Sequence, residues 1–207
     1  MPGGRSNQQL RTRAALLQAA GKLLSAGQQP SVAAAAEEAL VSVATAYRYF
    51  ATADELWTEA AQELTFDEEW FTGIERLIEE AGEDIAARAV VAARATVEEA
   101  LEKPYFFRRA ALAGQQQWFA QQADPEASDA PVRAGRRNRI IQAVLAPLRQ
   151  QGNEDAVRRL EAALTVLLGA EVMISLVDVA RLEPDDVIAT VTDMTCWVMA
   201  SALPELT

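Results

Sequence analysis

Residues 31–56, SVAAAAEEALVSVATAYRYFATADEL, decide the fold of this chain. Ser31 can start a helix through the alanine-rich stretch that follows it, because a serine hydroxyl accepts hydrogen bonds from the free amides of a first helical turn. Ser42 can start a second, short helix over residues 43–49 in the same way. Phe50 then turns inward. The stretch therefore predicts two short helices joined by a tight turn.

Helical patterns also flank this stretch. From Leu10 onward, apolar residues recur at alternating spacings of four and three, which predicts an amphipathic helix that Gly27 can end. The polar residues 1–9 before it are expected to form a flexible arm. After the stretch, Thr52 with Glu55 three residues later is a capping box, which predicts a longer linker helix.

Composition favours an all-α fold for the whole chain. The 207 residues are 50% hydrophobic, and they are rich in the residue types that lose least free energy on entering a helix. We expect a three-helix headpiece over residues 10–51 and a larger helical domain over residues 52–207. Glycine and proline residues divide the larger domain into further segments, about nine helices in total.

Charge is distributed unevenly along the chain. The net charge is −11, which taken alone argues against binding to nucleic acid. Residues 1–50, however, contain five basic and two acidic residues, a net charge of +3, so residues 51–207 carry −14. The first quarter can approach DNA, whereas the remainder would repel it.

Several functions lack the residues that they need. Histidine is absent and Cys196 is the single cysteine, so we expect no catalytic site, no metal site and no cofactor. The longest strongly apolar stretch begins at Ala162 and meets Glu171 after nine uncharged residues, too short to span a bilayer. We expect no membrane association and a location in the cytoplasm.

Residues 31–56 resemble the DNA-binding signature of the TetR family of helix-turn-helix regulators. In that signature a Ser/Thr-capped helix, a tight turn and a short aromatic helix precede a capped linker helix. Ala36 stands where the family keeps a small residue so that two helices cross closely, and Val41 and Phe50 stand at core positions. The resemblance implies these DNA-contacting residues: Arg11, Ser31, Ser42, Ala44, Thr45, Tyr47, Arg48, Tyr49 and Thr52.

The chemistry of these residues suits a major groove. One helix fits the groove, and hydroxyl and guanidinium groups on it can donate to phosphates or base edges. Arg48 can contact a phosphate or a guanine, and Tyr49 either donates to a phosphate or packs in the small core. Two positions depart from the family pattern: Leu40 replaces a common glycine, which is sterically unfavourable if the turn needs positive φ, and Ala53 replaces a lysine.

The larger domain is expected to bind an effector and to dimerise. The resemblance implies a small-molecule pocket, and its candidate lining residues are Trp70, Phe71, Phe106, Trp118, Phe119 and Met173. Two stretches, from Leu160 to Val179 and from Ile188 to Leu203, are apolar nearly all round and so need cover on every side. A second subunit is the expected cover. The candidate interface residues are Leu164, Leu168, Val172, Val191 and Val198.

The interpretation is a homodimeric, ligand-responsive TetR-like repressor that binds double-stranded DNA at a pseudo-palindromic operator. An unknown small molecule would be its effector. Two other functions stay open: a helical ligand-binding or interaction module whose headpiece has lost or weakened DNA binding, and an all-α enzyme. Two residues in the apolar stretches, Glu171 and Asp178, either face the pocket or pair with an arginine across the interface.

Overall fold

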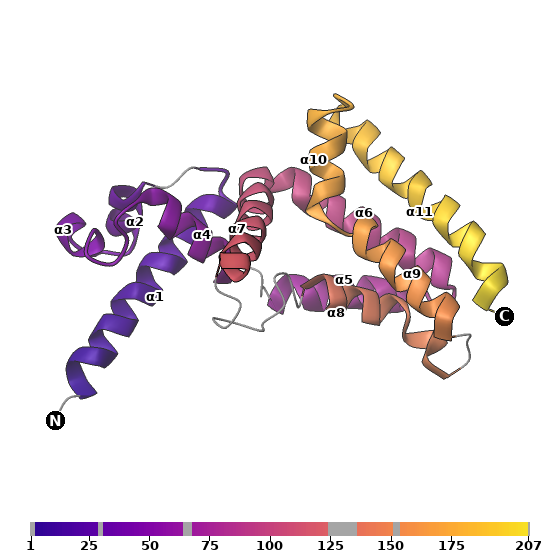
Figure 1. The fold of residues 1–207 in the computed structure, drawn as a ribbon, viewed down its shortest axis with the longest axis horizontal. Coiled ribbons are helices and arrows are strands. Elements are labelled where there is room, and N and C mark those ends of the chain that lie inside the picture. The colour runs from indigo at the N-terminus through magenta and orange to yellow at the C-terminus, as the bar shows by residue number, and fades with distance from the viewer. Residues whose placement is uncertain (1–2, 29–30, 64–67, 124–135, 151–153, 207) are drawn as a thin grey trace. The chain divides into compact units, whose positions relative to one another are not determined.

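The computed structural model describes residues 3–28, 31–63, 68–123, 136–150 and 154–206 (Figure 1). Within these ranges the chain is all-α, as predicted, with eleven α-helices, one 3₁₀ helix and no strand. The number exceeds the nine expected, in part because the apolar stretch from Leu160 to Val179 is divided at Gly169. The helices group into two compact units.

The first unit brings together five helices, including one from later in the chain. They are α1 (Gly3–Ser25), α2 (Val32–Glu38), α3 (Val43–Ala46), α4 (Ala53–Glu63) and α7 (Pro104–Ala123). Helix α1 packs against α2, α4 and α7, and α3 packs against α2 (Figure 1). Leu56 and Ala60 of α4 are buried in the same core cluster as Leu16 and Phe50. This unit therefore extends past residue 51, where the sequence analysis ends the headpiece.

Helix α1 begins earlier than predicted. It starts at Gly3, so residues 3–9, which were expected to belong to a flexible arm, are helical. Once a helix has nucleated, each further residue adds a hydrogen bond without the cost of a new nucleus. The predicted apolar stripe is correct only in its second half, because Leu10 and Ala14 are exposed whereas Leu17 and Leu24 are buried.

The turn between α2 and α3 is closed by backbone hydrogen bonds. The amide of Leu40 donates to the carbonyl of Glu37 at 3.1 Å, and the amide of Val41 donates to the carbonyl of Ala36 at 2.8 Å. These are the two hydrogen bonds of a Schellman motif, which requires a left-handed residue after the helix. Leu40 is that residue, with φ 56°. The turn thus does need the positive φ for which glycine is better suited.

Each predicted helix cap is present. The hydroxyl of Ser31 accepts from the amide of Ala34 at 3.0 Å. At the start of α4, the hydroxyl of Thr52 accepts from the amide of Glu55 at 3.2 Å, and the carboxylate of Glu55 accepts from the amides of Ala51 and Thr52. The capping box predicted from the spacing of Thr52 and Glu55 is confirmed.

The second unit is built around one central helix, α6, which packs against α5, α8, α10 and α11. The elements of this unit are α5 (Glu68–Glu80), α6 (Ile85–Glu102), α8 (Arg136–Val144), the 3₁₀ helix η2 (Ala146–Gln150), α9 (Glu154–Leu167), α10 (Ala170–Asp178) and α11 (Pro184–Leu206). The buried guanidinium of Arg88 in α6 donates to the carbonyls of Gly82, Ala143 and Val144. It thereby satisfies carbonyls that the ends of α5 and α8 leave unpaired.

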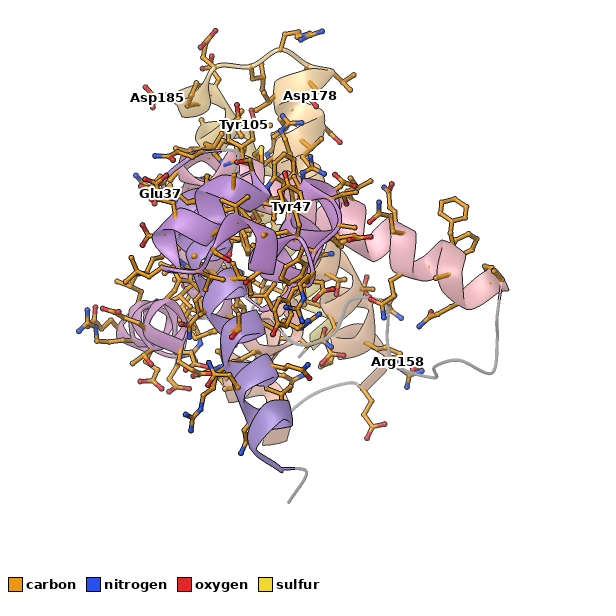
Figure 2. All side chains as sticks on the ribbon, turned by 90° about the vertical axis from the view of Figure 1, so that its left-hand side faces the viewer. Glu37, Tyr47, Tyr105, Arg158, Asp178 and Asp185 are labelled. Carbon is orange, nitrogen blue, oxygen red and sulfur yellow. The ribbon has the colours of Figure 1, made fainter. Side chains whose placement is uncertain are left out.

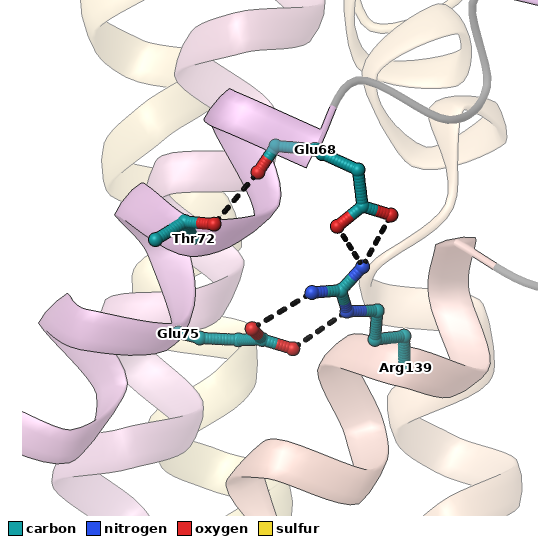
Figure 3. Close-up of polar contacts among 4 residues, drawn as sticks. All are labelled: Glu68, Thr72, Glu75 and Arg139. Carbon is teal, nitrogen blue, oxygen red and sulfur yellow. Dashed lines mark hydrogen bonds and ion pairs between the residues drawn. The ribbon is translucent and has the colours of Figure 1, made fainter.

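Arg139 of α8 ties that helix to α5 (Figure 3). Its guanidinium donates two hydrogen bonds to the carboxylate of Glu75, at 2.7 and 3.0 Å, and also contacts both oxygens of Glu68. The same group lies 4.5 Å from the ring centre of Phe71. The hydrogen bonds from Arg139 lower the pKa of the Glu75 carboxyl below its ordinary value, against the opposing effect of burial.

A bend at Gly169 separates α9 from α10. The two helices meet at 49°. Arg137 of α8 donates to the carbonyl of Thr165 at 3.1 Å and to the carboxylate of Glu171 at 3.0 Å. A Cβ on Gly169 would lie 2.5 Å from that carboxylate, so any other residue here would force the Glu171 side chain to shift. Glu171 therefore pairs with an arginine of its own subunit, a pairing that neither alternative given above includes.

Candidate nucleic-acid interface

Helix α3 is a single turn, and the residues that follow it form a tighter turn. It runs from Val43 to Ala46 rather than to residue 49, because the amides of Arg48 and Tyr49 donate to carbonyls three residues back, at 3.1 and 2.9 Å. This tighter pairing is typical of a last helical turn. The buried Ala46 and Phe50 fix α3 on the core of the first unit.

With one side of α3 buried, the other side faces outward. Val43, Ala44, Tyr47 and Arg48 are exposed, and 51% of the Tyr47 side chain is accessible. Figure 2 shows Tyr47 of this segment and Glu37 of α2. The predicted contact residues Ala44, Tyr47 and Arg48 are thus all exposed and lie within five consecutive residues.

The hydroxyls of Ser42 and Thr45 are paired with each other. The hydroxyl of Ser42 accepts from the amide of Thr45 at 3.2 Å and donates to the hydroxyl of Thr45 at 2.8 Å. Both predicted contact hydroxyls therefore lie together at the start of α3, where Ser42 is exposed and Thr45 is partly buried.

Two other residues of the headpiece contact its core. Tyr49 is partly buried and packs against the core cluster of the first unit. This placement fits the packing interpretation of Tyr49. Arg13 forms an ion pair with Glu59 of α4, and its guanidinium lies 5.4 Å from the ring centre of Phe50. Arg13 thus holds α4 against α1.

The remaining predicted contacts are exposed. Arg11 of α1 is accessible to solvent, as are the cap residues Ser31 and Thr52. Of the acidic side chains that lie nearby in sequence, two have partners within the chain. Glu38 pairs with Lys22 at 3.3 Å, and the carboxylate of Glu55 is held by the backbone of its own cap.

The candidate ligand-binding residues are divided between the two units. Phe106, Trp118 and Phe119 lie on α7 in the first unit, whereas Trp70, Phe71 and Met173 lie in the second. Phe106, Phe71 and Met173 are buried, and Trp118 and Phe119 are exposed. Neighbouring rings pair edge to face, as Trp70 does with Phe71 at 5.4 Å between centroids. Neither unit by itself brings the six residues together.

Four of the five candidate interface residues are buried within a single chain. Leu164, Leu168, Val172 and Val191 are buried within the second unit of a single chain, and Val198 is partly buried. Helix α9 packs against α8, α10 and α11, and α11 also packs against α6, so the buried faces of these helices form the core of the unit. The exposed apolar side chains of α9 and α11 are different ones, Val166 at 63% and Trp197 at 69% accessible.

Sequence reasoning missed two exposed aliphatic residues at the candidate interface. Leu40 in the turn is 95% exposed and Val43 on α3 is 45% exposed. The left-handed position of Leu40 could be suspected from its place in the motif. Its exposure depends on how α2 and α3 pack together, which local sequence does not reveal.

No protein-family model matches this chain, and no curated protein is significantly similar to it.

Proposed function

We propose that this protein is a ligand-responsive transcriptional regulator of the TetR type that binds operator DNA through α2 and α3. The observation that carries the proposal is the set of exposed side chains Val43, Ala44, Tyr47 and Arg48, on a segment that a capped turn and the buried Ala46 and Phe50 hold in place. In this proposal α3 enters the major groove, where Thr45, Tyr47 and Arg48 meet base edges and phosphates.

The charge distribution supports this assignment. Residues 1–50 have a net charge of +3 in a chain of net charge −11. Because phosphate contacts come from basic residues, DNA would approach this part of the first unit. The small excess of positive charge implies modest non-specific affinity, so that specific contacts must supply much of the binding.

We further propose a homodimer formed through α9 and α11. In α11 only 22% of the most apolar window is buried, and Trp197 and Cys196 are exposed on it. By length and composition this helix could also cross a membrane. Asp193, exposed in its middle, makes a second subunit the better cover, since charged side chains are costly inside a bilayer.

A dimer suits the proposed DNA contact. One short helix reads few base pairs, whereas two related subunits read the two halves of a pseudo-palindromic operator. We propose that the dimer acts in the cytoplasm as a repressor and that an unidentified small molecule sets the spacing of its two DNA-binding segments. Ligand and DNA would then change each other's affinity by the same factor. No catalytic step belongs to this proposal.

A mobility-shift titration against the DNA that flanks its own gene tests the proposal. We expect a discrete shifted complex whose affinity falls as the salt concentration rises. If no fragment shifts even at low salt, the protein is not a DNA-binding regulator. The second candidate function, a helical binding module with a degenerate headpiece, would then be favoured by the left-handed Leu40 and by the missing lysine at Ala53.

A further inference from the structure

Leu40 combines two unfavourable features. Among the described residues, Leu40 and Arg181 are the two non-glycine residues with positive φ. A left-handed backbone is costly for leucine because its Cβ approaches the carbonyl oxygen. In addition, 95% of the Leu40 side chain is exposed, so its apolar surface gains nothing from burial. A strained backbone conformation whose side chain makes no packing contribution is typical of functional sites.

Val43 extends the apolar surface that begins at Leu40. It is the first residue of α3, three positions after Leu40, and 45% of its side chain is exposed. Ala44, the next residue, is also exposed. This part of the first unit therefore presents aliphatic groups to an external partner.

The charge around these residues indicates the partner. Between Ala39 and Ala53 the only charged residue is Arg48, which is exposed; two exposed glutamates, Glu37 and Glu38, precede this segment, and Glu38 is paired with Lys22. A surface that combines aliphatic groups with one cation matches a DNA major groove, where phosphates line the walls and each thymine presents a 5-methyl group on the floor. An acidic or zwitterionic protein surface would call for more charges of both signs.

We propose that Leu40 and Val43 contact thymine 5-methyl groups in the operator and so select thymine at defined positions. This inference rests on the proposed function. It assigns a role to the leucine that replaces the glycine common at this turn: the strained side chain is retained because it contributes to DNA recognition.

The test is a binding cycle that combines protein variants with modified DNA. The DNA is a shifted fragment in which deoxyuridine replaces thymine, one position at a time, so that only methyl groups are removed. Against the wild-type protein we expect an affinity loss of about fourfold for each contacted methyl. In the Leu40→Gly and Val43→Ala variants the protein no longer contacts its methyl group. Replacing that thymine with deoxyuridine should therefore change the affinity of the variant by less than about 1.5-fold.

A second readout separates this role from ordinary packing. Leu40→Gly removes the strain, so its Tm should rise by about 2 °C while its affinity for the unmodified fragment falls. Arg181→Gly is the matched control, because it relieves the same backbone conformation in the second unit. It should raise the Tm and leave the affinity for the fragment within about twofold of the wild type.

Each outcome decides the inference. If deoxyuridine fragments bind the wild type as well as thymine fragments do, the methyl contact is refuted and the DNA-binding proposal stands. An unchanged affinity of Leu40→Gly and Val43→Ala, or a loss of self-association instead of DNA affinity, also refutes it. If the wild type shifts no DNA at all, the proposed function fails, and this inference fails with it.

Discussion

The guanidinium of Arg109 lies 4.2 Å from the ring centre of Trp57 and forms an ion pair with Asp54, so α7 holds α4 through one side chain. Arg13 of α1 holds the same helix through Glu59. Helix α4 follows the proposed DNA-binding segment directly in the chain. Its position is therefore set by contacts from two helices that lie far apart in sequence.

Replacing Arg109 should loosen this contact. Because the guanidinium is planar and both stacks and pairs, Arg109→Ala should lower the free energy of unfolding by about 1–2 kcal/mol. Arg109→Lys, which keeps the charge but not the flat surface, should recover less than half of the loss. Urea unfolding followed by circular dichroism measures both. A lysine variant as stable as the wild type would show that stacking contributes nothing.

Phe50 is the aromatic centre of the first unit. It is 1% exposed in a core cluster that contains leucines such as Leu16 and Leu56 as well as alanines such as Ala36 and Ala46. Phe50→Ala should lower the free energy of unfolding by about 3–5 kcal/mol, because it removes a fully buried ring and leaves a cavity in the core. Phe50→Leu should cost less than half as much. Thermal unfolding compares the two, and equal losses would mean that ring volume is not what stabilises this core.

The ion pair of Glu75 with Arg139 should make the second unit sensitive to acid. The pKa of Glu75 is lowered from its ordinary value of 4.5 by hydrogen bonds from Arg139, so the folded state favours the charged carboxylate. This contribution to stability is complete above pH 4.5 and is lost as the pH falls through the lowered pKa. Glu75→Gln should therefore be less stable than the wild type at pH 7, and the difference should shrink toward pH 3. A difference that does not change with pH contradicts this account.

A double-mutant cycle at Gly169 and Glu171 tests whether a side chain at position 169 disrupts the ion pair of Glu171 with Arg137. Gly169→Ala places a Cβ 3.1 Å from the guanidinium carbon of Arg137 and must displace its pairing with Glu171. The pair is partly exposed, so Glu171→Gln alone should cost only about 0.5 kcal/mol. In the Gly169→Ala background, the same change should cost nothing. Additive losses in a double-mutant cycle would show that the ion pair tolerates the methyl group.

The exposed face of α11 should control self-association. Trp197→Glu adds a charge to an exposed apolar position and should convert the proposed dimer to a monomer in sedimentation velocity. Leu77→Glu on α5 is a matched control, because Leu77 is also exposed and apolar. If both variants sediment like the wild type, α11 is not the subunit interface.

Local sequence signals predicted where helices begin, but they did not predict which side of each helix is buried. Ser31, Ser42 and the pair Thr52 and Glu55 act on amides within four residues, so their spacing suffices to place helix starts. Which side of a helix is buried depends on contacts between distant segments. For that reason Leu164 and Val191 were assigned to a subunit interface although they form the core of one chain.

In the candidate site, too, some features follow from local sequence and others do not. The exposure of Tyr47 and Arg48 follows from the burial of Ala46 and Phe50 on the opposite side of a short helix, a pattern that the sequence contains. The mutual pairing of the Ser42 and Thr45 hydroxyls requires rotamers that no sequence pattern specifies.

The most direct test of the account compares DNA affinity before and after Tyr47 and Arg48 are both replaced by alanine. Fluorescence anisotropy with the fragment that the wild type binds gives the affinity, and sedimentation velocity confirms that the variant has the wild-type oligomeric state. We expect a loss of at least about tenfold in affinity with no change in assembly. A double variant that binds the fragment as tightly as the wild type would contradict the assignment of α3 as the DNA-contacting helix.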